Sequence, residues 1–300
     1  MAHVDQLANY FGNTRGKSPA DQLIGAEIET FFADRDGAAI SIETSQSIMR
    51  DLAAGTWNIA DRKGEMITVL HRDGSRILYE LGYPNLELAV RPERRTQIIA
   101  DTRQLLGELY GAAERYGASP VFAPMFTSEK SYLAVPDDRD ATWLRLDGKK
   151  ALSPLACISA VQFTIDVDVE SATEALNKLN AVRDRFLADY PQDKVWVEYV
   201  QTSPAGYLGD RYGGPDTFDS LGHYCLQLSR HAVVQGSTLV PFEQADLNTN
   251  RAIELFIRSV WWYFRLRRYG ANLCIEVRPL PRRHDEKLDD QLSQVLDTVK

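Results

Sequence analysis

The order of secondary structure along the chain predicts an α+β fold with a mainly antiparallel sheet. In the first third of the sequence, short predicted strands follow one another directly. A repeated βαβ fold would instead alternate each strand with a helix. Four segments alternate between apolar and polar residues, a pattern typical of sheets with one buried and one polar face. The chain has 300 residues, 44% of them hydrophobic, and can bury the core of one large domain or two small ones.

The first half of the chain contains most of the predicted strands. Gly, Pro, Ser and Asn cluster in residues 11–20, so we expect residues 1–20 to be an N-terminal extension and residues 21–300 a single domain. The first strong signal is a strand at residues 23–32. The elements expected next are a helix near 44–54, strands near 66–71, 75–81 and 85–91, and an amphipathic helix at 94–118.

The second half begins with residues 124–150, whose mixed charge, Pro and Gly predict a long connection. Residues 202–216 contain four glycines and two prolines, which is typical of a mobile loop and suggests a lid. The other expected elements are strands at 156–169, 195–201 and 272–280, and helices at 170–188, 217–230, 246–269 and 285–299.

Composition narrows the classes of function. The net charge of −8, from 42 acidic and 34 basic residues, disfavours a nucleic-acid-binding protein, although a bound metal ion would permit an anionic substrate. No apolar run approaches the ~18 residues that span a bilayer, and residues 1–10 lack the apolar segment of a secretory signal. Cys157, Cys225 and Cys274 are odd in number and far apart, which fits reduced thiols. We therefore expect a cytoplasmic protein with no membrane or nucleic-acid partner.

The polar faces of four predicted strands carry the candidate site. Side chains alternate between the two faces of a strand, so residues two apart share a face. An ordinary solvent-exposed face would give the same pattern, but here it contains few Lys, Thr or Ser, and long intervening segments could cover it. The polar members considered are Glu27 and Glu29, Asn85, Glu87 and Arg91, Gln162, Thr164, Asp166 and Asp168, and Asn272, Glu276 and Arg278.

Several carboxylates on one covered face repel each other, and loss of solvent adds to this unfavourable energy. Divalent cations would remove the conflict. Mg²⁺ prefers hard oxygen ligands and usually keeps substrate phosphates as partners. Glutamates facing an arginine therefore indicate a site for a metal ion and a nucleotide.

Four motifs resemble those of the glutamate–cysteine ligase family, closest to its plant and proteobacterial branch. GAEIETFF (25–32) is similar to the opening G-x-E-x-E strand, and Glu80 and Glu87 in YELGYPNLEL (79–88) keep a seven-residue spacing of acidic residues. Asn85 stands where that branch has Gln. ISAVQFTIDVD (158–168) resembles the strand that offers Gln or His to a metal, and CIEVRPLP (274–281) the late E-x-R strand. The resemblance extends over residues 22–282.

This resemblance implies a glutamine-synthetase-like catalytic domain, with a curved antiparallel sheet and helices packed on one face. It also implies ATP and Mg²⁺ as cofactors and a ligase that joins a small-molecule carboxylate, such as glutamate, to an amine, such as an amino acid, forming an amide bond. Arg278 would contact the transferring phosphoryl group, and Arg211 would be a second contact. ATP would be held by Glu27, Glu29 and Arg278. The implied metal ligands are Glu27, Glu29, Glu80, Glu87, Gln162 and Glu276.

Two other functions remain open. The same scaffold could serve a small-molecule phosphotransferase that stops after phosphoryl transfer, or a nucleotide-binding homologue without catalysis. The residues Pro279, Leu280 and Pro281 depart from the plant-like pattern, which leaves the substrate open more than the reaction type.

Several conspicuous residues are predicted to have structural roles only. Trp261 and Trp262 are expected in a buried helix, with Arg265, Arg267 and Arg268 at its C-terminal end, where cations offset the helix dipole. His223 is expected at the surface. Cys157 is expected in the core, whereas Cys274 falls on the polar face and its role stays open.

Overall fold

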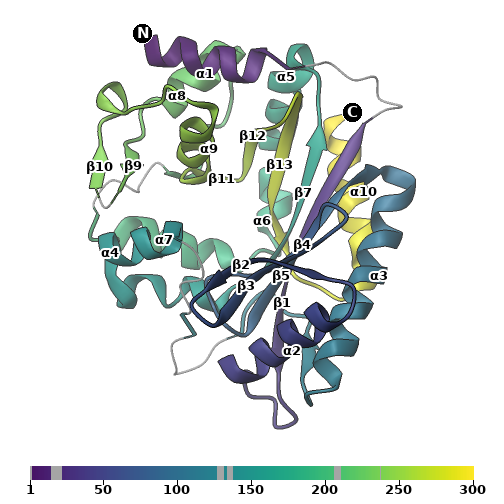
Figure 1. Ribbon diagram of the computed structural model, residues 1–300. Coiled ribbons are helices and arrows are strands. Elements are labelled where there is room, and N and C mark those ends of the chain that lie inside the picture. The colour runs from purple at the N-terminus through teal and green to yellow at the C-terminus, as the bar shows by residue number, and fades with distance from the viewer. Residues whose placement is uncertain (1, 15–21, 127–131, 134–137, 206–210, 237) are drawn as a thin grey trace.

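The fold is α+β and is built around one large, mainly antiparallel sheet (Figure 1). A computed structural model describes residues 2–14, 22–126, 132–133, 138–205, 211–236 and 238–300. None of the helices in these ranges combines the length and the apolar composition that crossing a bilayer requires.

Within the described part of the chain, nine strands form this sheet, and every pairing in it is antiparallel. The central strand β1 (Leu23–Ala33) lies between β5 and β7, so the two strands that carry Glu87 and Gln162 flank the one that carries Glu27 and Glu29. The order across the sheet is β12 (Phe264–Tyr269), β13 (Asn272–Pro281), β7 (Ala160–Asp166), β1, β5 (Asn85–Arg94), β4 (Ser75–Tyr79), β3 (Met66–Arg72) and β2 (Asn58–Lys63), with β6 (Ser119–Val121) paired to β1.

Helices cover the apolar face of the sheet, which is the face that the alternation predicted to be buried. Ile28, Leu88, Val161 and Ile275 are completely buried between the strands and these helices. Figure 1 shows α3 and α10 side by side along this face. The covering helices are α2 (Ile42–Ala54), α3 (Arg95–Glu114), α5 (Val169–Ala181), α6 (Arg183–Leu187) and α10 (Leu288–Val299).

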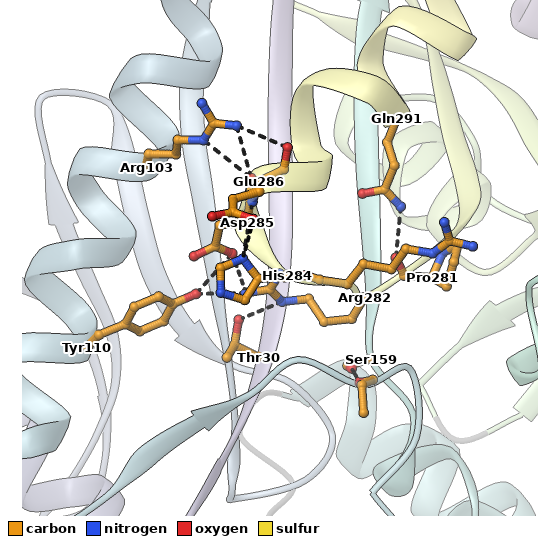
Figure 2. Close-up of polar contacts among 12 residues, drawn as sticks. Thr30, Arg103, Tyr110, Ser159, Pro281, Arg282, His284, Asp285, Glu286 and Gln291 are labelled. Atoms are coloured by element: carbon orange, nitrogen blue, oxygen red, sulfur yellow. Dashed lines mark hydrogen bonds and ion pairs between the residues drawn. The ribbon is translucent and has the colours of Figure 1, made fainter.

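A buried arginine fastens the end of β13 to the back of the sheet (Figure 2). Thr30 is the polar residue on the apolar face of β1, and its hydroxyl accepts a hydrogen bond of 3.1 Å from Arg282. Arg282 also donates to Tyr110 on α3 and to Asp285, both at 2.7 Å. Asp285 thus supplies the carboxylate that pairs with the buried Arg282, shortly before α10 begins at Leu288.

The N-terminal segment differs from the prediction. Residues Ala2–Gly12 form the helix α1, which packs on α8 (Leu221–Leu228) and β12. Leu7 and Phe11 are fully buried in the main core, so α1 packs into that core, where the sequence predicted no helix. Residues 15–21 of the predicted loop lie outside the described residues.

The predicted strand at 195–201 is wrong, because these residues belong to the helix α7 (Gln192–Thr202). Its alternating apolar residues also fit a helix, and Trp196, Tyr199 and Val200 lie on one helical face. The connection predicted at 124–150 contains a second missed helix, α4 (Asp138–Leu152), which bends at Gly148 (φ 79°).

The predicted helix at 246–269 is also wrong beyond its first turns. The helix α9 (Asn250–Arg258) ends early, and the chain continues as β11 (Trp261–Trp262) and β12. A segment that is apolar on all sides of a helix also suits a buried strand, and aromatic residues favour the strand. Trp262 is buried as expected, but Arg265 and Arg267 lie in a strand and do not cap a helix.

The remaining strands are short. β8 (Tyr212–Gly213) pairs with β11, and β9 (Val233–Gln235) pairs with β10 (Thr238–Val240). Cys157 lies in a 3₁₀ turn at residues 155–157, half-buried, and so outside the strand and core expected for it. Residues 206–210 of the predicted lid lie outside the described residues, so that role stays a prediction.

Candidate active site

A cavity of about 530 Å³ lies on the polar face of the sheet. Strands from β12 to β2 contribute to its floor, so it extends across almost the whole sheet. The residues predicted to bind metal, together with Arg278, all line it: Glu27, Glu29, Glu80, Glu87, Gln162 and Glu276.

Three of these carboxylates form a compact acidic cluster, Glu29, Glu80 and Glu87. Glu29 and Glu87 are directly opposite each other in the pairing of β1 with β5. One oxygen from each of the three residues lies within 4.8 Å of the others. Among the described residues this is the group whose spacing suits a shared metal ion.

The turn between β4 and β5 places Glu80 in the cluster. The Glu80 N–H donates to the carbonyl of Asn85 at 3.2 Å, which folds the seven-residue segment back on itself. The Asn85 side chain donates to the carbonyl of Ile158 at 3.1 Å. A Cβ on Gly82 would lie 2.6 Å from the carbonyl oxygen of Ala156, so only glycine permits this close approach.

Gln162 connects the acidic cluster to Arg278. Its amide nitrogen donates to Glu29 at 3.1 Å, and its carbonyl oxygen accepts from Arg278 at 2.9 Å. The second oxygen of Glu29 accepts from the backbone N–H of Ala160 at 2.8 Å. The carbonyl oxygen that could bind a metal is therefore engaged by Arg278 in this structure.

A β-bulge sets the position of Arg278. Val277 pairs with Phe163 and Leu280 with Val161, so Arg278 and Pro279 together face the single residue Gln162. Proline has no N–H to donate to a ladder and is tolerated at such a bulge. The bulge brings Arg278 beside Gln162 on the cavity side, the face that the alternation predicted for Arg278.

The acidic side of the cavity holds carboxylates that resist ionisation. Burial raises the pKa of Glu29 well above its ordinary value, and the nearby charge of Glu80 raises it further. Burial and the neighbouring carboxylates Glu27 and Glu80 do the same to the pKa of Glu87. The pKa of Glu27 is raised by burial and by Glu276. Without cations, deprotonating this cluster is therefore unfavourable.

The other side of the cavity pairs one glutamate with arginines. Burial alone would raise the pKa of Glu276, but Arg265, Arg267 and Arg278 together lower it below its usual range. Both side-chain oxygens of Glu276 accept from Arg265, which also donates to the carbonyl of Ile257 at 3.1 Å. Burial lowers the pKa of Arg265 to about 10. Arg267 is 3.6 Å from Glu276, and Arg278 is 3.8 Å away.

The acidic cluster fits Mg²⁺, which prefers hard oxygen ligands. Divalent cations would offset the repulsion that raises the pKa of these carboxylates. The charge of Glu276 is offset by its neighbouring arginines, so we do not assign Glu276 as a metal ligand. Glu27 lies between the acidic cluster and Glu276 with its arginines.

Arg211 lies outside the cavity. Its buried side chain donates to Ser259 at 2.9 Å and to the carbonyls of Ser259 and Ala232. Its guanidinium carbon is 5.9 Å from the centre of the Trp143 ring, which lines the cavity. Arg211 therefore supports the wall from behind, and we do not assign it a contact with substrate.

Sequence reasoning missed two groups of lining residues. Arg265 and Arg267 were assigned to a helix, although their two-residue spacing matches the strand pattern that located Glu276 and Arg278. The aromatic residues Trp143, Trp196 and Trp261 come from segments predicted as a connection, a strand and a helix. No local motif marked them as neighbours.

Comparison with known proteins supports the fold. No protein-family model matches the sequence, and no curated protein matches it significantly. Among solved structures, the chain is similar to a bifunctional glutathione synthetase from Pasteurella multocida, with a TM-score of 0.52 and 13% sequence identity. The match covers 99% of this chain and 40% of the synthetase, so the chain spans less than half the length of that protein. At this identity the similarity shows a shared fold.

Proposed function

We propose that the protein is an ATP- and Mg²⁺-dependent carboxylate–amine ligase, of the reaction type of glutamate–cysteine ligase. The observation that carries this proposal is the link in one cavity between the acidic cluster and Arg278, made through Gln162. The fold shared with a bifunctional glutathione synthetase supports it as well.

The proposed reaction has two steps. A carboxylate oxygen of the acid attacks the γ-phosphorus of ATP, the bond from phosphorus to ADP breaks, and an acyl phosphate forms. The amine nitrogen then attacks the acyl carbon, the C–N bond forms, and the C–O bond to phosphate breaks. The nitrogen loses a proton to solvent, and phosphate leaves.

The side chains divide this work between them. Glu29, Glu80 and Glu87 would hold Mg²⁺, which supplies charge neutralisation for the phosphate oxygens. Arg278 would donate to the transferring phosphoryl group, since a guanidinium is a planar double donor that stays charged. Gln162 would keep Arg278 oriented, because its amide bonds both Arg278 and Glu29.

The test is phosphate release from ATP across pairs of carboxylic acids and amines. We expect release that requires Mg²⁺, an acid and an amine together, with the amide found by mass spectrometry. A phosphorylated acid that accumulates whether or not amine is present would indicate the phosphotransferase instead. No binding of ATP in the presence of Mg²⁺ would contradict both enzymatic proposals.

A further inference from the structure

The cavity has a charged floor and an aromatic roof. The floor consists of the sheet residues described above. The roof comes from α4, α7 and β11, and Figure 1 shows α4 and α7 next to each other, across the sheet from α3 and α10. Four aromatic side chains of the roof line the cavity: Trp143, Trp196, Tyr199 and Trp261.

The roof aromatics hold one another in place. The ring of Trp261 lies 5.0 Å from that of Trp143, 5.1 Å from Trp196 and 5.8 Å from Tyr199, measured between ring centres. Trp196 also stacks on Tyr212 at an interplanar angle of 11°. Such a preformed surface loses little conformational freedom when a ligand binds.

The hydroxyls at the edge of the roof already have partners. Tyr199 donates to Asp147 at 2.7 Å, and the same carboxylate accepts from Ser203 and from the backbone N–H of Ala205. Tyr212 donates to Asp193 at 2.8 Å. The hydroxyl of Tyr199 is therefore engaged away from the cavity, which its ring lines, and Tyr212 supports Trp196 from behind.

The roof adjoins the acidic cluster. Leu81 and Ile158 pack against the roof aromatics. Leu81 follows Glu80 in the chain, and Ile158 is two residues before Ala160, whose N–H binds Glu29. A group on the roof thus lies a short molecular distance from the proposed site of phosphoryl transfer. The adenine of ATP is separated from its γ-phosphate by a ribose and two further phosphates, so a substrate side chain suits this place better.

Charge decides which substrate the roof suits. The face of an aromatic ring carries negative partial charge. The ring faces of the roof therefore attract an amine that arrives as an ammonium ion and disfavour the carboxylate of the acid. The acid is instead favoured at the other side, near Arg267 and Arg278.

We propose that the amine substrate carries an aromatic or large branched apolar side chain, which packs under Trp143, Trp196, Tyr199 and Trp261. This inference rests on the proposed ligase function, in which that amine attacks the acyl phosphate. It assigns the amine site a ligand larger than cysteine or glycine.

Calorimetric titration of the protein with phenethylamine, without ATP or acid, tests the site directly. We expect phenethylamine to bind at least about 10-fold tighter than ethylamine, because an aromatic ring gains from burial that a methyl group lacks. Trp196→Ala should weaken phenethylamine binding by about 10-fold, whereas Trp196→Phe should retain most of it. Trp57→Phe is the matched control, because Trp57 is buried and does not line the cavity.

Other results of these titrations would distinguish an amine site from an adenine site, and the roof site from the ligase function. Equal affinity for phenethylamine and ethylamine would overturn the inference. So would a Trp196→Ala variant that is folded by circular dichroism and loses affinity for ATP but not for phenethylamine, because the roof would then hold adenine. Tight, Trp196-dependent binding of phenethylamine without any ATP turnover would support the roof site and contradict the ligase function.

Discussion

Glutamates on the two sides of the cavity differ in ionisation although they share one sheet face and are similarly buried. On the β12–β13 side, arginines lower the pKa of Glu276. On the β1–β5 side, burial and like charges raise the pKa of Glu29 and Glu87. Partner charges, and not burial alone, decide the sign of these shifts.

Glu276 has counter-charges from neighbouring arginines, whereas the acidic cluster lacks counter-charges of its own among the described residues. Glu276 has its counter-charges within the protein, so its ion pairs are available to stabilise the fold. The acidic cluster is linked to the cation Arg278 only indirectly in the part of the chain that the structure describes, from Glu29 through Gln162. It would be completed by cations that arrive with a ligand. An unfavourable cluster of this kind is expected where a protein gives up stability for function.

The largest expected effect is a loss of stability when the ion pairs of Glu276 are broken. Glu276→Gln leaves Arg265 buried without its carboxylate partner, and removing one member of a buried ion pair destabilises by about 3–5 kcal/mol. Urea denaturation should show this loss. The control Glu93→Gln removes the partner of Arg91 in a half-exposed pair and should change stability by about 1 kcal/mol or less. Similar stabilities for the two variants would contradict the contrast between the two sides.

Arg278 connects the two sides, and its replacement tests the catalytic assignment. Arg278→Lys keeps the charge but loses the planar double donor, so we expect turnover to fall by about 10²-fold, or ~3 kcal/mol, with folding intact. Steady-state kinetics of the ligase reaction would measure it. Arg91→Lys, outside the cavity, should retain full activity. Full activity in Arg278→Lys would exclude Arg278 from phosphoryl transfer.

Removing repulsion among the carboxylates of the acidic cluster should stabilise the protein. Glu87→Gln removes one of the repelling carboxylates, so the metal-free protein should gain about 1 kcal/mol and melt ~2 °C higher. Thermal unfolding should also show that added Mg²⁺ with ATP no longer stabilises this variant. A lower melting temperature without metal would mean that Glu87 is stabilising in the empty site.

The pH dependence of stability should have opposite signs on the two sides. Since the pKa of Glu87 lies above 4.5 in the folded protein, its contribution is fully present below that pH and is lost as the pH rises through the raised value. Glu276, whose pKa is lowered, contributes stability above pH 4.5 that is lost as the pH falls. Urea denaturation from about pH 4 to pH 8 should show the stability gain of Glu87→Gln growing with pH. A gain that stays constant would contradict the raised pKa.

The sequence predicted the positions of the site residues best where they lie in strands, because period-two alternation alone assigns each residue to a face. Period-two alternation placed Glu27, Glu29, Glu87 and Glu276 on the polar face, because burying one face of a sheet specifies the register. The α+β class and the mainly antiparallel sheet followed from the order of the predicted strands and helices. Glu80 was found through the spacing of its motif, since it lies in a turn.

The roof and the details of the site depended on tertiary structure. The segment around Trp196 satisfies both helical and strand periods, and the segment around Trp261 is apolar in either form, so local pattern could not decide between them. The metal-binding role expected for Gln162 stays a prediction, but its hydrogen bond with Arg278, which the bulge in β13 places beside it, was not foreseen. A bulge depends on the pairing of two distant strands, which no local motif records.

Calorimetric titration of ATP, with and without Mg²⁺, tests the central claim most directly. We predict that ATP binds the wild-type protein only with Mg²⁺, that EDTA abolishes binding, and that Glu87→Gln weakens it while Arg91→Lys does not. In buffers of different ionisation enthalpy, binding below the raised pKa of Glu87 should release protons. Equal affinity for ATP with and without Mg²⁺, unchanged in Glu87→Gln, would contradict the assignment of the acidic cluster as a divalent-cation site.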